Sequence, residues 1–114
     1  MAGLVLGAVA LGALAQGQAG AAAADSYADR AVIAIPEAKM VGEATVKCRA
    51  GYHATGGGFV LATDGVYASA SGPAFDNGDP QPRGWRAQLR RNAGASTINL
   101  KTAGYVNVVC AKDS

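Results

Sequence analysis

The chain has 114 residues, with 10 Lys and Arg against 8 Asp and Glu, and its net charge of +2 is too small to indicate nucleic-acid binding by itself. Its 16 glycines and its low aromatic content of 6% indicate many turns and strands with small side chains. All charged residues lie after Ala24, so the composition changes abruptly at that position.

The first part of the chain has the pattern of a signal peptide. Residues 4–15 (LVLGAVALGALA) form an apolar run of the length of a signal-peptide core, about 7 to 15 residues, and well short of the about 20 that span a bilayer. Small residues at 22–24 then precede Asp25, as at an A-x-A cleavage site, although no Lys or Arg opens the segment. We predict a signal peptide over residues 1–24, an extracellular, secreted product and no membrane span.

The remaining residues suffice for one small domain, whose core is marginal without a crosslink. Its two cysteines, Cys48 and Cys110, allow a single pairing, and in an exported chain they predict a disulfide. The alternative is two buried free thiols. Closing a loop of about 60 residues contributes roughly 4 kcal/mol in the chain-entropy model.

The domain is expected over residues 31–114, after a flexible polar N-terminal segment at 25–30. The β-branched residues of 31–35 predict a first strand, which Pro36 ends, and a loop follows. Residues 43–48 alternate between apolar and polar side chains, so Cys48 is expected to face the core.

A triple glycine, Gly56, Gly57 and Gly58, precedes Phe59 at the start of the next predicted strand. Three glycines allow a bulge or a close backbone approach, and we expect them to let Phe59 enter the core. The alternating residues 66–71 are expected to form a hairpin with this strand through a turn at 63–65.

Residues Gly72 to Gly84 hold three of the four prolines and the run Asp-Asn-Gly-Asp, so we expect a long exposed loop. In the strand after it, Trp85 shares the inner face with Ala87 and Leu89, and Trp85 is expected to anchor the core. Between Ile98 and Cys110 the residues predicted to face the core all occupy even-numbered positions, so they would lie on one side of an extended chain. This pattern fits either one bent strand or a hairpin over residues 101–104.

About six strands at short spacing, with no helical period after residue 24, predict an all-β fold: a small antiparallel β-sandwich or barrel with one disulfide. The two inward-facing cysteines lie on separate strands of this fold.

The pattern C-x-A-G-x4-GGGF from Cys48 to Phe59 is followed by S-G-P at 71–73, G-W at 84–85, Asn92 and a closing V-C-A at 109–111. This ordered combination resembles a module of small secreted actinobacterial proteins, which also occurs as tandem repeats in larger surface or phage-type proteins. Arg49 stands where that module usually has Pro. The resemblance implies pairing of the first and last cysteines, and no catalytic residue.

Candidates for chemistry are few. His53 is the single histidine, and the bridged cysteines leave it without partners for a metal site. A triad of Ser69 or Ser71 with His53 and Asp64 can be drawn, but no G-x-S-x-G motif supports a hydrolase. The acidic turn at 76–79 lacks the distal Glu of a calcium loop. We therefore expect no metal, no cofactor and no enzymatic activity.

The clearest functional pattern is a row of outward-facing polar residues on the strand after Trp85. Alternate residues of a strand share a face, so this row could bind phosphate or carboxylate groups, although such residues often only keep a sheet face soluble. The members and neighbours of this predicted stripe are Arg83, Arg86, Gln88, Arg90 and Arg91.

The leading hypothesis is therefore a secreted, non-enzymatic structural or binding module that contacts an anionic cell-envelope glycan or another secreted protein. Nucleic acid is not an expected partner. The alternative is a small extracellular protease inhibitor that presents the loop Gly72 to Gly84 as a substrate mimic.

Overall fold

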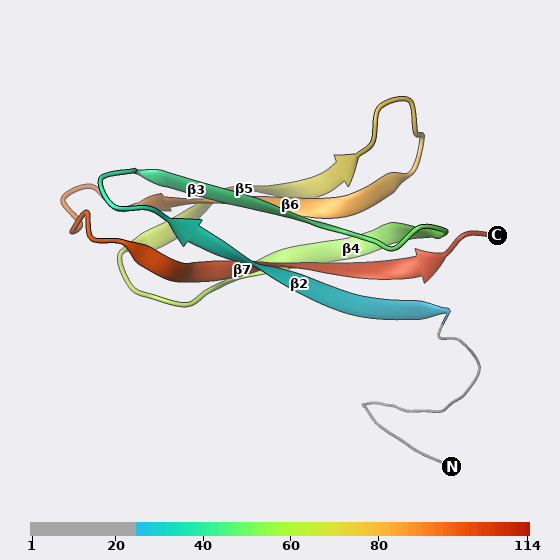
Figure 1. Cartoon of the computed structure of the whole chain (residues 1–114), viewed down its shortest axis with the longest axis horizontal. Coiled ribbons are helices and arrows are strands. Elements are labelled where there is room, and N and C mark those ends of the chain that lie inside the picture. The colour runs from blue at the N-terminus through green and yellow to red at the C-terminus, as the bar shows by residue number, and fades with distance from the viewer. Residues whose placement is uncertain (1–24) are drawn as a thin grey trace, which may run out of the picture.

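The computed structural model describes residues 25–114, and the predicted signal peptide lies outside the described residues. Residues 25–114 form six β-strands (Figure 1). They are β2 (Ser26–Ile35), β3 (Val41–Lys47), β4 (Tyr52–Leu61), β5 (Val66–Phe75), β6 (Pro82–Arg91) and β7 (Leu100–Lys112). Within this range no helix is long and apolar enough to cross a membrane.

The strands form two antiparallel sheets of three strands each, packed face to face (Figure 1). The strand orders are β2-β7-β4 and β3-β6-β5, so β7 and β6 are the central strands. The predicted all-β sandwich is therefore confirmed. Each sheet buries one face, which explains the alternation of buried and exposed residues along β3 and β6.

The predicted hairpin between residues 59–61 and 66–71 is wrong. Strand β4 pairs with β7, whereas β5 pairs with β6, so the turn between β4 and β5 crosses from one sheet to the other. Gly65 has a φ of 82° in this turn. Alternation along a strand shows which side chains are buried but does not identify the neighbouring strand, and for this reason the pairing could not be read from the sequence.

The prediction of a flexible segment over residues 25–30 is wrong for residues 26–30. Strand β2 begins at Ser26, which pairs with Ala111, and continues along β7. Strand β7 is long enough to satisfy the backbone of this polar segment. The Tyr27 ring packs edge-on against Tyr52, with ring centroids 5.2 Å apart.

The segment from Gly72 to Gly84, predicted as a long loop, is a β-hairpin with a shorter connection in the structure. Strand β5 continues to Phe75 and β6 begins at Pro82, which leaves only residues 76–81 as the connection. Strand β5 is an edge strand, where a proline such as Pro73 costs no ladder hydrogen bond if its nitrogen faces outward.

Of the two alternatives for residues 98–110, the structure has one strand. Strand β7 begins at Leu100 and contains a bulge between Leu100 and Gly104, where its pairing with β2 shifts. Ile98 lies before the strand with 62% of its surface exposed, so its predicted inward orientation is wrong. Cys110 is fully buried, as predicted.

The disulfide between Cys48 and Cys110 joins the two sheets. Cys48 directly follows β3 in one sheet, Cys110 lies in the central strand β7 of the other, and their Cα atoms are 5.8 Å apart. The predicted pairing is confirmed. The buried apolar residues of the core come from both sheets and include Ile33, Ile35, Val46, Ala54, Val66, Ala87, Leu89, Ala103, Val106 and Val108.

The triple glycine makes room for Trp85 instead of Phe59. The glycines lie inside β4, where a Cβ atom on Gly57 would meet the Trp85 ring at 2.4 Å. Trp85 packs partly buried against the core, and its Nε1 donates to Ser71 Oγ at 2.9 Å. Phe59 is 42% exposed, so its predicted burial is wrong. Its strand is an edge strand, and nothing covers that side of the sandwich among the described residues.

Candidate functional site

The outer face of β6 carries three of the five residues of the predicted stripe. Ala87 and Leu89 are buried between the sheets, and Arg86 and Arg90 are exposed on the other side of the strand with Gln88 between them. We call Arg86, Gln88 and Arg90, with their cross-strand neighbours Glu43, Ser69 and Tyr67, the outer β6 face.

Two of these three side chains have partners on the neighbouring strands. Arg86 Nε donates to Glu43 Oε2 at 2.7 Å, and this hydrogen bond with the guanidinium charge lowers the pKa of the Glu43 carboxyl. Ser69 Oγ donates to Gln88 Oε1 at 2.8 Å. These bonds fix the positions of Arg86 and Gln88, and the charge of Arg86 is largely matched by Glu43.

Arg90 is the positive group of this face that the structure leaves without an ion pair among residues 25–114. It lies directly opposite Tyr67 of β5, whose surface is 45% exposed, and opposite Val41 of β3. Paired residues of antiparallel strands point to the same side of the sheet. A guanidinium and an aromatic ring are therefore presented side by side to solvent.

Arg83 does not belong to this face. Its Nη1 donates to Asp113 Oδ2 and to the carbonyl oxygen of Tyr52, each at 2.8 Å, and its Nε donates to Asp79 at 2.5 Å. These bonds raise the pKa of Arg83 and lower the pKa of both carboxyls. Arg83 thus connects the β5–β6 hairpin to the start of β4 and to the C-terminal residues, and its inclusion in the stripe was wrong.

Arg91 was also wrongly assigned to the stripe, because it is only 3% exposed. Arg91 follows Trp85, Ala87 and Leu89 at every second position of β6, and these positions point to the inner side of the sheet. The alternation in the sequence therefore already indicated that Arg91 is buried. Its guanidinium donates to backbone carbonyl oxygens of the β2–β3 and β6–β7 connections and pairs with no described carboxylate. These acceptors belong to Lys39, Ser96, Ile98, Pro36 and Ile35.

His53 is not placed for the triad considered above. Its Nδ1 lies 2.8 Å from Asp113 Oδ1, at the start of β4, whereas Asp64 follows the end of the same strand. A strand of this length separates the two by roughly 30 Å at about 3.3 Å per residue. Ser69 and Ser71 bond to Gln88 and Trp85 instead of His53.

The acidic turn between β5 and β6 is used for structure. Asp76 pairs with Lys47, and Asp79 accepts from Arg83 and from the backbone N–H of Gln81 at 3.0 Å. Over residues 25–114 no group of three or more His, Cys, Asp or Glu side chains is arranged to hold a metal ion.

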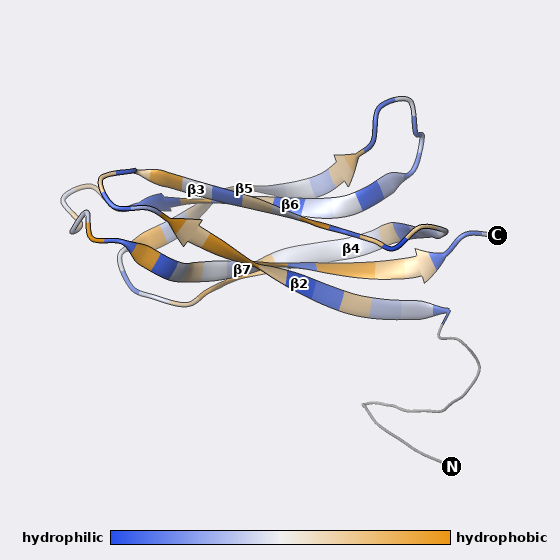
Figure 2. Ribbon diagram, in the orientation of Figure 1, coloured by the Kyte–Doolittle hydropathy of each residue, from blue (hydrophilic) through white to orange (hydrophobic). Residues whose placement is uncertain are grey.

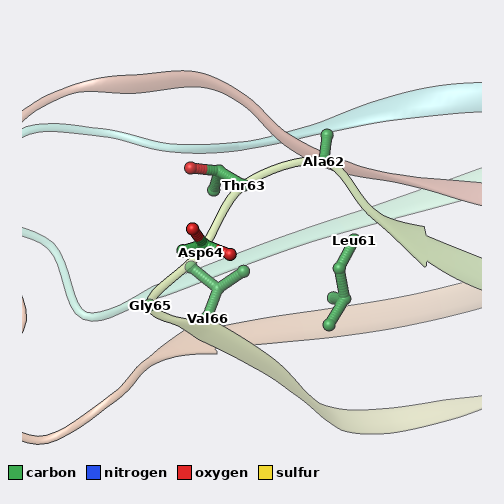
Figure 3. A pocket seen from close by; sticks show the side chains of 6 residues that line it. All are labelled: Leu61, Ala62, Thr63, Asp64, Gly65 and Val66. Carbon is green, nitrogen blue, oxygen red and sulfur yellow. The ribbon is translucent and has the colours of Figure 1, made fainter.

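Among the surface hollows of residues 25–114, the one at the turn between β4 and β5 does not combine groups from several elements. The hollow in Figure 3 lies against the β4–β5 connection, and its walls come from that single turn. Its lining residues are Leu61, Ala62, Thr63, Asp64, Gly65 and Val66. Active sites usually combine convergent polar groups from several elements, an arrangement that this turn does not provide.

No model of a known protein family, no curated protein and no solved structure matches the chain.

Proposed function

We propose that the chain is an exported, non-enzymatic binding module that contacts an anionic cell-envelope glycan through the outer β6 face. The observation that carries this proposal is the exposed cross-strand pair of Arg90 and Tyr67. An aromatic ring packs against the apolar face of a sugar, and a guanidinium binds carboxylate or phosphate with two parallel hydrogen bonds. The pair therefore combines the two contacts that an acidic sugar requires.

The rest of the face supports the same ligand class. Gln88 and Ser69 supply polar atoms next to Arg90, and they are held by their mutual hydrogen bond. Arg86 is positioned by Glu43, which reduces its contribution to anion binding. The bridge from Cys48 to Cys110 is consistent with an oxidising, extracytoplasmic location.

A binding assay on an immobilised acidic polysaccharide tests the proposal. We expect retention on polygalacturonate in 20 mM salt, no retention on neutral dextran, and release of the protein at about 0.5 M salt, where charges are screened over a few Å. Arg90→Ala and Tyr67→Ala should each weaken binding roughly tenfold, as expected for the loss of about 1.4 kcal/mol. Glu43→Gln should strengthen binding, because it releases Arg86.

Lys101→Ala is the matched control. Lys101 is exposed in β7 of the other sheet, and its removal changes the net charge by the same amount. Equal losses for Lys101→Ala and Arg90→Ala would show binding by net charge alone and would refute the assigned face. Absence of retention of the unaltered protein on any acidic polymer at low salt would refute the glycan ligand.

The exposed loop on which the protease-inhibitor alternative depends is shorter than predicted. The exposed connection is residues 76–81 and not the whole of Gly72 to Gly84, and both of its aspartates pair with basic side chains. No contact within residues 25–114 favours this alternative.

A further inference from the structure

Strand β4 is an unprotected edge. It is an outer strand of the sheet β2-β7-β4, and within residues 25–114 its only pairing partner is β7. Half of the N–H and C=O groups of an edge strand point away from the sheet and can bond to another extended chain.

The other sheet edges carry the features that usually prevent such pairing. Strand β2 contains Asp29 and Arg30, β3 contains Glu43, and β5 contains Pro73. By contrast, residues 54–63 of β4 and its following turn (ATGGGFVLAT) contain no charged residue and no proline. The glycine run is pale in Figure 2, which reflects the absence of strongly hydrophilic side chains.

This edge also exposes three consecutive apolar side chains. Phe59, Val60 and Leu61 are 42%, 49% and 41% exposed. Phe59 pairs with the fully buried Val106 and therefore points to the inner side of the sheet. Its exposure results from the missing neighbour beyond β4, and a strand added there would cover it.

We propose that two copies of the chain pair antiparallel, β4 against β4, about a twofold axis at Gly58. In this register Phe59 lies opposite Gly57 of the second copy, and Val60 lies opposite Gly56. Phe59 and Val60 thus each meet a residue without a side chain, so this part of the edge is complementary to itself in shape, and no charge opposes the contact. The bulge at residues 54–56 marks the end of the paired segment.

The pairing extends the sheet from three strands to six. It brings Phe59 of one copy beside Gly57 of the other, over which the partly exposed Trp85 ring lies. The twofold axis of an antiparallel strand pair is perpendicular to the sheet, so the outer β6 faces of both copies point the same way. A polymer could then engage both faces at once and bind more tightly than to one copy. The pairing itself does not depend on the proposed ligand.

Sedimentation of the chain from residue 25 onward, the range that forms both sheets, tests the pairing over a series of protein concentrations. We expect a reversible dimer. Gly58→Lys and Gly58→Glu should each weaken dimerisation roughly tenfold or more, because two like charges would lie directly opposite each other at the axis. An equimolar mixture of these two variants should dimerise again, because the charges are then opposite.

Gly72→Lys in β5 is the matched control and should leave the dimer intact. A Cβ atom at Gly58 or at Gly72 meets no atom within 4 Å, and neither residue has a positive φ, so both substitutions are compatible with the fold. If Gly58→Lys nevertheless unfolds, the double variant Gly56→Lys with Val60→Lys must produce the same loss, because residues 56 and 60 of the two copies lie directly opposite each other and a Cβ atom at Gly56 meets no atom within 4 Å.

Three results would overturn the proposal. They are a monomer at every concentration, a dimer that Gly58→Lys or the folded double variant at residues 56 and 60 leaves unchanged, and a failure of the mixed Lys and Glu variants of Gly58 to associate. A monomer that still binds polygalacturonate would remove the pairing and keep the proposed function.

Discussion

The disulfide between Cys48 and Cys110 should supply a large part of the stability of this domain. The bridge closes a loop with a sequence separation of 62, which corresponds to about 4 kcal/mol in the chain-entropy model at 25 °C. A domain of this size has a total free energy of unfolding of about 5 to 13 kcal/mol. Loss of the bridge therefore removes about a third or more of that stability.

The perturbation is best made in two ways, because each has a different side effect. Reduction of the unaltered protein with dithiothreitol opens the bridge but leaves a thiol at Cys110, which is fully buried. The double variant Cys48→Ala with Cys110→Ala removes both sulfur atoms and leaves a small cavity, which adds a cost of its own. If the reduced protein and the double variant lose the same free energy of unfolding within about 1 kcal/mol, the loss is due to the crosslink.

Urea unfolding followed by the fluorescence of Trp85, the single tryptophan, provides the measurement. We expect both forms to lose about 4 kcal/mol and to melt about 15 to 30 °C lower than the oxidised protein. The free energy of unfolding should fall more steeply with urea concentration in both forms, because an unfolded chain without the bridge exposes more surface. A loss below about 1 kcal/mol in both forms would refute the loop-closure reasoning.

Two further predictions concern buried or paired arginines. Arg91→Leu should lower the free energy of unfolding by about 2 to 4 kcal/mol in the same urea assay, because several partly buried carbonyl groups lose a charged donor that is itself buried, and a loss within about 0.5 kcal/mol would contradict this role. For Arg83→Gln we expect a lower melting temperature at pH 7 and a difference from the unaltered protein that shrinks as the pH falls below about 4. The sign follows because Arg83 lowers the pKa of Asp79 and of Asp113 below the ordinary value of 3.8, so the stabilisation is present above that value and is lost as the carboxyls protonate. A difference that stays constant down to pH 2 would contradict this assignment.

The residues of the candidate site illustrate how far alternation along a strand can be used. It correctly placed Arg86 and Arg90 on the outer side of β6, and the same parity carried one step further would have placed Arg91 inside. It could not show that Arg86 is paired with Glu43, because the neighbour of a residue across a sheet depends on strand order. The exposed pair of Arg90 and Tyr67 emerged only when β5 and β6 were seen to be neighbours.

What the sequence by itself determined was local. Alternating apolar residues and turn residues established the all-β class and the burial of Ala87, Leu89 and Cys110, and the count of two cysteines established their pairing. These properties depend on the pleat of a single strand or on simple counting.

Tertiary structure decided which strands are neighbours, and several corrections follow from that. Strand β7 gives residues 26–30 a partner, and β4 pairs with β7 instead of β5. The Trp85 ring occupies the space over Gly57, and Phe59 is left at an open edge. These outcomes depend on contacts between residues far apart in the chain, whose formation is governed by packing and backbone hydrogen bonding over the whole sandwich.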